Sequence, residues 1–155
     1  MTDAVLRRST ARVLLIDETD AVLLFLTYGV SHDVPPRWIT PGGGLEPGED
    51  FRAAGERELF EETGLKARLD EPFRVVELAV DQRWHPYQVG HWAWFALRTR
   101  RFEPSADGWM ADERADIVDW RWWHTEELER ERPEVEPGDL VLLAREALTL
   151  AQSER

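Results

Sequence analysis

The sequence has no cysteine. This excludes disulfides, thiolate metal ligands and a cysteine nucleophile, and it fits a reducing compartment such as the cytoplasm. Basic residues are also few: 19 Lys and Arg stand against 31 Asp and Glu, for a net charge of −12. Because nucleic acids are bound by fields of Lys and Arg, we expect no nucleic-acid partner. A ligand that carries phosphate then needs a cation to bridge it to the protein.

Long apolar runs are absent as well. The longest, AVLLFL at residues 21–26, is far shorter than the roughly 20 residues needed to cross a bilayer. Residues 1–10, MTDAVLRRST, lack the apolar segment of a signal peptide. We therefore expect a soluble, cytoplasmic protein with no membrane partner.

What is present is a composition that folds: 43% of the 155 residues are hydrophobic, and eight are Trp. Such a chain is long enough for a core of its own without metal or disulfide support. No repeat or linker interrupts it, so we expect a single domain over residues 1–155.

The pattern of apolar residues predicts an α/β fold. Short apolar segments predict strands at residues 12–17, 21–27, 38–39, 74–80, 89–99 and 117–123. Helices are predicted at 50–63, from 126 onward, and at 139–151. The segment 89–99 is apolar on both faces, which is typical of a central strand, and 101–116 reads as a polar loop. This order favours a mixed sheet with helices packed on it.

Local signals mark the ends of these helices. Asp50 is the expected N-cap of the first helix and Gly64 its stop, and Thr125 is the expected cap of the second. The residues PGGG at 41–44 read as a tight turn.

Three acids, Glu58, Glu61 and Glu62, lie on one face of the first helix, since residues three and four apart are neighbours. Like charges at this spacing repel, and a partly buried cluster raises its pKa values unless a cation sits among them. Taken alone, such a run is most often a solvated helix face.

The neighbours favour a recess instead of a solvated face. The same side of the helix carries apolar or small residues, namely Phe51, Ala54, Gly55 and, beside them, Leu59. We expect the carboxylates to line a recess in which Ala54 and Gly55 leave room for a ligand. An all-oxygen donor set suits Mg²⁺ or Mn²⁺ better than zinc.

The glycines before the helix allow two interpretations. They form a tight turn, or they let backbone N–H groups approach a phosphate or aim a carbonyl at a metal. On the second interpretation Gly43 and Gly44 contact the substrate. No Lys-Ser or Lys-Thr follows, which excludes a Walker loop, and the spacing is wrong for a dinucleotide fingerprint.

Residues 43–65 resemble the Nudix box, G-x5-E-x7-R-E-U-x-E-E-x-G-U, where U is a bulky aliphatic residue. Every specified position of the pattern is matched, by Gly43, Glu49, Arg57, Glu58, Leu59, Glu61, Glu62, Gly64 and Leu65. The resemblance implies the family's α/β/α sandwich with a mixed sheet. It also implies divalent-metal-dependent hydrolysis of the pyrophosphate bond in a nucleoside diphosphate linked to another moiety.

The resemblance also implies roles for the box residues. Glu58 and Glu62 would be metal ligands, and Glu61 a ligand or a group that positions water. Arg57, counted with the catalytic set, would pair with Glu49 and orient the helix; the alternative is an exposed pair of little energetic worth.

A further acid is expected from a later loop. Glu113 is the first candidate and Asp112 the second, because the family often takes an additional acid from beyond the box. A loop acid without a role is an equal alternative.

Aromatic residues near loops are candidates for stacking on a base or capping a substrate. Trp38 is assigned to substrate binding, and His32, Trp84 and Tyr87 are further candidates. For each of the four, the alternative is core packing or ordinary surface exposure.

The competing class is a Nudix-like nucleotide sensor or interaction domain that binds without hydrolysis. The intact set of box glutamates favours the enzyme. The family's isoprenoid-diphosphate isomerases use a cysteine, which this chain lacks. The sequence does not fix the nucleotide substrate, the general base, the number of metal ions or the oligomeric state, although dimers are common in the family.

Overall fold

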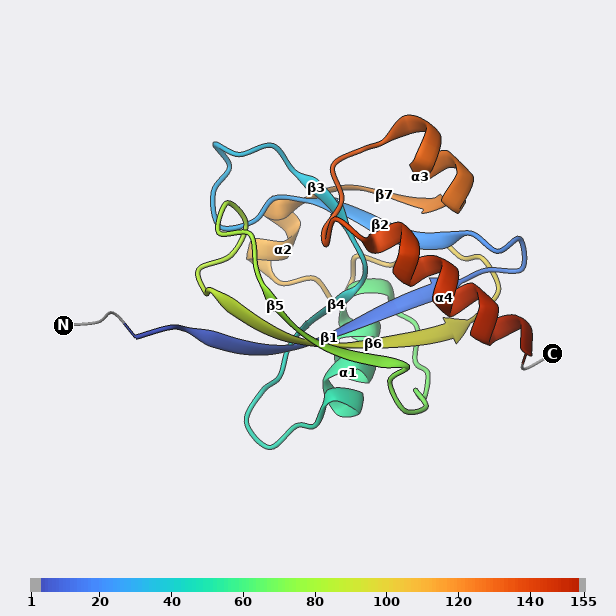
Figure 1. Ribbon diagram of the computed structural model, residues 1–155, viewed down its shortest axis with the longest axis horizontal. Helices are drawn as coiled ribbons and strands as arrows, with labels where there is room; N and C mark the ends of the chain where they lie inside the picture. The colour runs from blue at the N-terminus through green and yellow to red at the C-terminus, as the bar shows by residue number, and fades with distance from the viewer. Residues whose placement is uncertain (1–3, 154–155) are drawn as a thin grey trace.

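The computed structural model describes residues 4–153, which form one mixed sheet with helices on both faces (Figure 1). The strands are β1 (Arg7–Ile16), β2 (Val22–Thr27), β3 (Arg37–Ile39), β4 (Gly42–Gly44), β5 (Arg74–Ala79), β6 (Val89–Arg98) and β7 (Ile117–Trp123). The helices are α1 (Phe51–Thr63), α2 (Ala111–Asp116), α3 (Thr125–Glu131) and α4 (Leu140–Ser153). Within the described range, no helix has the length and apolar character needed to span a bilayer.

The strands follow the order β3-β2-β1-β6-β5, with β4 paired to β1 and β7 paired to β2. β1 and β6 run parallel along their whole lengths, from Arg7 opposite Val89 to Ile16 opposite Arg98. The other pairings are antiparallel. The mixed sheet is therefore confirmed, and so is the central position of β6 between β1 and β5.

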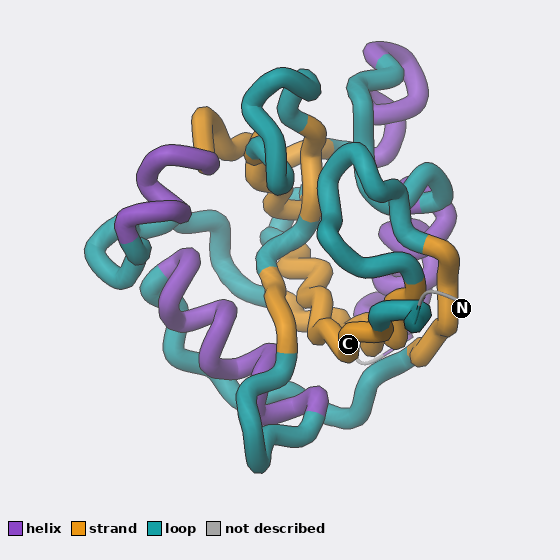
Figure 2. The backbone as a smooth tube through the Cα atoms, turned by 90° about the vertical axis from the view of Figure 1, so that its left-hand side faces the viewer, coloured by secondary structure: helices purple, strands orange, loops and turns teal. Residues whose placement is uncertain are grey.

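Each face of the sheet has its own apolar core. Alternate residues of a strand point to opposite faces, so β1 supplies Leu14 to the core beneath α4 and Val13 to the core beneath α1. Leu143 of α4 and Leu59 of α1 pack on these two faces. Figure 2 shows helical segments on both sides of the strands. This arrangement is the expected α/β/α sandwich.

The ends of α1 are set by its own sequence. Asp50 Oδ1 accepts a hydrogen bond from Ala53 N at 2.8 Å. Gly64 adopts a left-handed conformation, with φ of 82°, and its N–H donates to Phe60 O. Both predicted caps are confirmed, because capping depends on residues within one turn of the helix end.

The small residues of α1 do not leave room for a ligand. Ala54 is fully buried, and a Cβ at Gly55 would lie 2.8 Å from Leu69 Cδ1. The expectation that they open a recess is wrong, because the sheet and the following loop occupy that space. The recess forms one turn later on the helix.

Three further expectations are corrected. Residues 42–44 form β4 instead of only a turn, and a Cβ at Gly42 would lie 2.1 Å from Ala11 O, so glycine permits this close pairing with β1. Within the predicted loop, residues 111–116 form α2, where Glu113 Oε1 accepts from Met110 N at 3.0 Å. α3 begins at Thr125 itself, so its N-cap is the preceding residue, His124.

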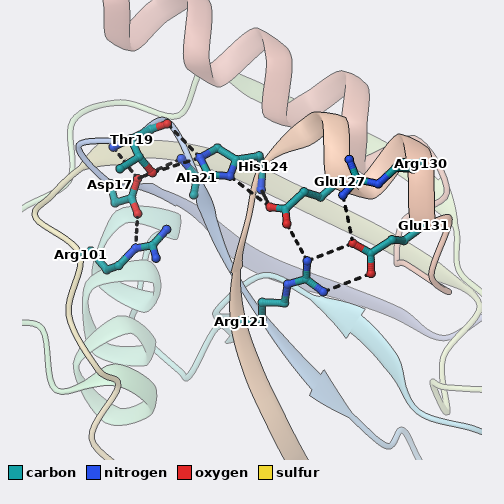
Figure 3. A network of polar contacts seen from close by, with 9 residues as sticks. All are labelled: Asp17, Thr19, Ala21, Arg101, Arg121, His124, Glu127, Arg130 and Glu131. Carbon is teal, nitrogen blue, oxygen red and sulfur yellow. Dashed lines mark hydrogen bonds and ion pairs between the residues drawn. The ribbon is translucent and has the colours of Figure 1, made fainter.

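A network of charged and polar groups joins the β1–β2 turn to β7 and α3 (Figure 3). Asp17, just after β1, accepts from Thr19 N at 2.8 Å and from Arg101 Nε at 2.6 Å. The network continues through His124, Glu127, Arg121 and Glu131.

Candidate active site

A cavity of about 400 Å³ opens beside the C-terminal half of α1. Its lining combines acids from α1 and from α2 with arginines from β1 and β3. The charged and histidine side chains that line it are Arg8, Arg12, Arg37, Glu58, Glu62, His85, Asp112, Glu113 and Asp116. Opposite charges from distant parts of the chain therefore meet in one place.

Glu62 is held at the wall of this cavity by β4. Its side chain is mostly buried, with the residue 8% exposed, and its Oε1 accepts the N–H of Gly42 at 3.0 Å. Glu58 lies one turn earlier on the same face of α1. A Cβ at Gly43 would lie 2.5 Å from the Glu58 carboxyl carbon, so a side chain at position 43 would displace this carboxylate.

The position of Glu62 disfavours its charged form. Burial, followed by the charge of Glu58, raises the pKa of Glu62 well above its usual range, and Arg12 opposes this. Burial also raises the pKa of Glu113, with a contribution from Glu58. Acids whose pKa is raised by burial and by a neighbouring carboxylate gain from a cation placed beside them.

Arg57 fastens the helix to the preceding loop. Its Nε and Nη2 donate to the two carboxylate oxygens of Glu49 at 2.8 and 2.9 Å, and Nη2 also donates to Gly44 O at 3.0 Å. The Glu49 bond chiefly raises the pKa of Arg57, and Arg57 in turn lowers that of Glu49. The predicted Arg57–Glu49 pair is confirmed.

Glu61 lies outside the cavity, although Arg57 Nη1 joins it to Glu58 by donating a hydrogen bond to each carboxylate. Its Oε2 accepts from Arg57 Nη1 at 3.3 Å, and it does not line the cavity. Across residues 4–153, no group of three or more His, Asp or Glu side chains has metal-ligating geometry. The structure thus brings together Glu58 and Glu62, with Glu113 on the same cavity wall. It does not bring the three helix glutamates to one point.

The aromatic candidates separate into two groups. Trp84 lines the cavity. Trp38 lies on the other side of β3, where it packs edge to face on Trp123 with ring centroids 5.2 Å apart. Tyr87 is buried in the core beneath α4, and His32 stacks on Tyr28, which does line the cavity.

The arginines of the cavity were not anticipated from the sequence. Arg37 Nη2 pairs with Glu136 Oε1 at 2.8 Å, and His85 Nε2 lies 2.8 Å from the same oxygen. One signal was available for Arg12: it stands in the apolar run of a central strand, and arginine is seldom buried there without a purpose.

A family model named NUDIX domain matches residues 6–145. The chain belongs to the Nudix family. The resemblance carried by residues 43–65 is thereby confirmed, and in the structure this segment is β4, the loop that Arg57 secures, α1 and its Gly64 cap. This Nudix chain is a pyrophosphohydrolase.

Relatives of this Nudix hydrolase include two kinds of enzyme. An RNA pyrophosphohydrolase of Afipia carboxidovorans is 29% identical over 126 residues, covering 74% of this chain and 76% of the relative. Diphosphoinositol polyphosphate phosphohydrolase 3-alpha of Mus musculus is 43% identical over 53 residues, covering 34% of this chain. This chain spans about a third (32%) of the mouse protein.

Solved structures share the fold. A MutT protein from Methanosarcina mazei Go1 superposes with a TM-score of 0.70 at 16% identity, covering 97% of this chain and 99% of that one. A NUDIX hydrolase from Nitrosomonas europaea gives 0.69 at 20% identity, covering 94% and 90%. At these identities the likeness concerns the fold alone.

Proposed function

We propose that this Nudix hydrolase uses Mg²⁺ or Mn²⁺ to cleave the pyrophosphate bond of a nucleoside diphosphate linked to another moiety. The observation that carries the proposal is Glu62, a buried carboxylate held against Glu58 in a cavity. A fold does not place a buried carboxylate beside a second one for stability, because burial and the neighbouring charge both disfavour the charged form of Glu62.

Glu58 and Glu62 would hold the metal, since both offer oxygen ligands of the kind that Mg²⁺ and Mn²⁺ prefer. The bound ion supplies positive charge to the phosphate oxygens and makes a bound water easier to deprotonate. Glu61 remains a candidate for the same set or for positioning water.

The other residues have supporting roles in this proposal. Glu113 lines the cavity with a raised pKa, and a more basic carboxylate is better suited to take a proton from water. The Gly42 N–H fixes one oxygen of Glu62. Arg57 positions α1 relative to Gly44 and Glu49 and does not line the cavity.

A second candidate substrate is a phosphorylated RNA end. It is favoured by relatives named RNA pyrophosphohydrolase, among them the one from Bradyrhizobium diazoefficiens at 32% identity over 105 residues. The acidic composition argues against a broad nucleic-acid-binding surface. Such an enzyme would therefore bind mainly the phosphorylated terminus of the RNA.

The experiment is a hydrolysis screen of nucleoside di- and triphosphates, sugar nucleotides, dinucleotides and 5′-triphosphorylated RNA, with Mg²⁺ or Mn²⁺. The native protein is compared with Glu62→Gln and with Glu126→Gln, a matched control that removes an exposed glutamate of α3 outside the cavity. We expect Glu62→Gln to lower turnover by about 10²- to 10⁴-fold and Glu126→Gln to behave as native.

Two results would contradict the proposal. Equal turnover in the native protein and Glu62→Gln would remove Glu62 from the mechanism. Saturable binding of a nucleotide with no hydrolysis of any substrate would favour the sensor.

A further inference from the structure

Arg12 is a buried cation that forms no direct ion pair, although the charges of Glu62 and Glu136 act on it from farther away. It is 8% exposed and lines the cavity. Its Nη1 donates to Thr40 O at 2.8 Å, but its buried Nε has no hydrogen-bond acceptor. In the described part of the chain, no carboxylate oxygen lies within 4.0 Å of this guanidinium, although a guanidinium carries five donors.

The neighbouring Arg37 shows how this fold pairs another buried arginine of the same cavity. Arg37 is 4% exposed, and its Nε and Nη2 donate to Glu136 Oε1 at 3.0 and 2.8 Å. Burying a charge is costly unless it is paired. Arg12 is buried almost as deeply in the same cavity without that pairing, so its guanidinium donors remain available to an anionic ligand.

Arg12 stands directly beside the acid pair. In the antiparallel pairing of β1 with β4 it lies opposite Gly42, and directly paired residues have Cα atoms about 4.5–5.5 Å apart. The N–H of the same Gly42 donates to Glu62 Oε1. Arg12 and Glu62 are close enough to shift each other's pKa, so a group bound at Glu62 lies near Arg12.

Two neighbours shape this position. The Arg12 guanidinium carbon lies 5.4 Å from the centre of the Trp92 ring, which supports the cation from one side. Arg8, four positions back on the same face of β1, also lines the cavity, and its guanidinium lies against Gly44. Arg8 has no ion-pair partner within 4.0 Å among the residues that the structure describes.

We propose that Arg12, assisted by Arg8, binds a phosphate group that adjoins the diphosphate held at Glu58 and Glu62. The preferred substrates are then those with at least three linked phosphates, in which the moiety attached to the nucleoside diphosphate itself begins with phosphate. The forked donors of a guanidinium match phosphate oxygens well. The inference rests on the proposed function for the bond that is cleaved.

Calorimetry with inorganic tripolyphosphate and pyrophosphate, in the presence of Mg²⁺, tests the subsite without turnover. We expect the native protein to bind tripolyphosphate about tenfold more tightly than pyrophosphate. Arg12→Gln should lower the affinity for tripolyphosphate about 10- to 100-fold, which is the loss typical of a charged hydrogen bond. Its affinity for pyrophosphate should stay within about threefold of the native value. Arg7→Gln is the matched control, because it removes an exposed arginine of the same strand outside the cavity.

Unchanged tripolyphosphate affinity in a folded Arg12→Gln protein would overturn the subsite. Should that variant fail to give a cooperative thermal transition, Arg12→Lys and Arg8→Gln carry the test. Each variant is expected to lose at least about threefold more affinity for tripolyphosphate than for pyrophosphate. If both variants kept the native preference for tripolyphosphate, the proposal would also be overturned.

Kinetics separate this inference from the proposed function. Arg12→Gln should raise KM for a nucleoside triphosphate more than for a diphosphate-linked sugar nucleotide, with kcat changed less. Glu62→Gln should instead lower kcat for both. If the native protein hydrolyses neither, the proposed function fails, whereas the calorimetric preference for tripolyphosphate still decides the subsite.

Discussion

The molecule contains two clusters of charged groups that differ in how completely they are paired. In the network of Figure 3, Asp17 meets Arg101, and Glu127 meets both Arg121 and His124. In the cavity, Glu62 stands against another carboxylate, and Arg12 has no carboxylate within ion-pair distance.

The pKa values express this difference. Burial raises the pKa of Asp17, but hydrogen bonds from Thr19 and Arg101 outweigh it and hold the value below the usual range. The backbone N–H of His124 chiefly lowers the pKa of Glu127 to about 2. In the cavity, burial raises the pKa of Glu62 and Glu113. Completed pairing stabilises the fold, and incomplete pairing leaves charge available for a ligand.

Exchanging Glu62 for Gln should affect function and stability in opposite directions. Alongside the loss of turnover given above, we expect the free energy of unfolding in metal-free buffer at pH 7 to rise by about 1 kcal/mol or more, because one pKa unit corresponds to about 1.4 kcal/mol. Urea denaturation measures this. A less stable variant would show that the carboxylate contributes to the fold as the network acids do.

Asp17→Ala should give the reverse pattern, a loss of stability without a direct effect on chemistry. Removing this acid leaves Arg101 and two backbone N–H groups unpaired, at a cost of about 3 kcal/mol. Because its pKa is lowered in the folded state, its contribution is present above about pH 4 and is lost as the pH falls further. A native-like urea midpoint at pH 7 would contradict this.

Divalent ions should stabilise the protein more as the pH rises. The folded pKa of Glu62 lies above its unfolded value, so its stabilising contribution is present below about pH 4.5 and is lost as the pH rises through the folded pKa. Mg²⁺ competes with this proton and should add about 1–3 kcal/mol at pH 8 but little at pH 5. Thermal melts with and without Mg²⁺ measure the difference, and Glu62→Gln is the control in which the pH dependence should flatten.

The smallest effect is expected at the solvent-exposed rim of the network. Glu131→Ala removes an ion pair with Arg121 at 3.1 Å, but both side chains are more than a third exposed. Such pairs contribute about 0–1 kcal/mol and weaken with salt. A change in the urea midpoint as large as that of Asp17→Ala would remove the distinction between buried and exposed members of the network.

Features with local causes could be predicted from the sequence. The caps of α1 at Asp50 and Gly64 depend on hydrogen bonds within one turn, and the Arg57–Glu49 pair joins residues only eight apart in the chain. The central position of β6 follows from its two apolar faces.

Features that depend on contacts between distant parts of the chain could not be predicted from the sequence. β4 exists because β1 lies beside it, and the space expected near Gly55 is filled by Leu69. Trp38 packs on Trp123 because the two strands that carry them both pair with β2.

By itself the sequence determined the family, the helix that carries the acids, and the presence of carboxylates at a fixed spacing, because these depend on residues close together in the chain. The tertiary structure decided which of those carboxylates share a cavity, turned Glu61 toward Arg57, and set Arg12 of β1 opposite Gly42 of β4. Those outcomes depend on burial and on the strand register between distant segments, and the spacing of residues along the chain contains neither.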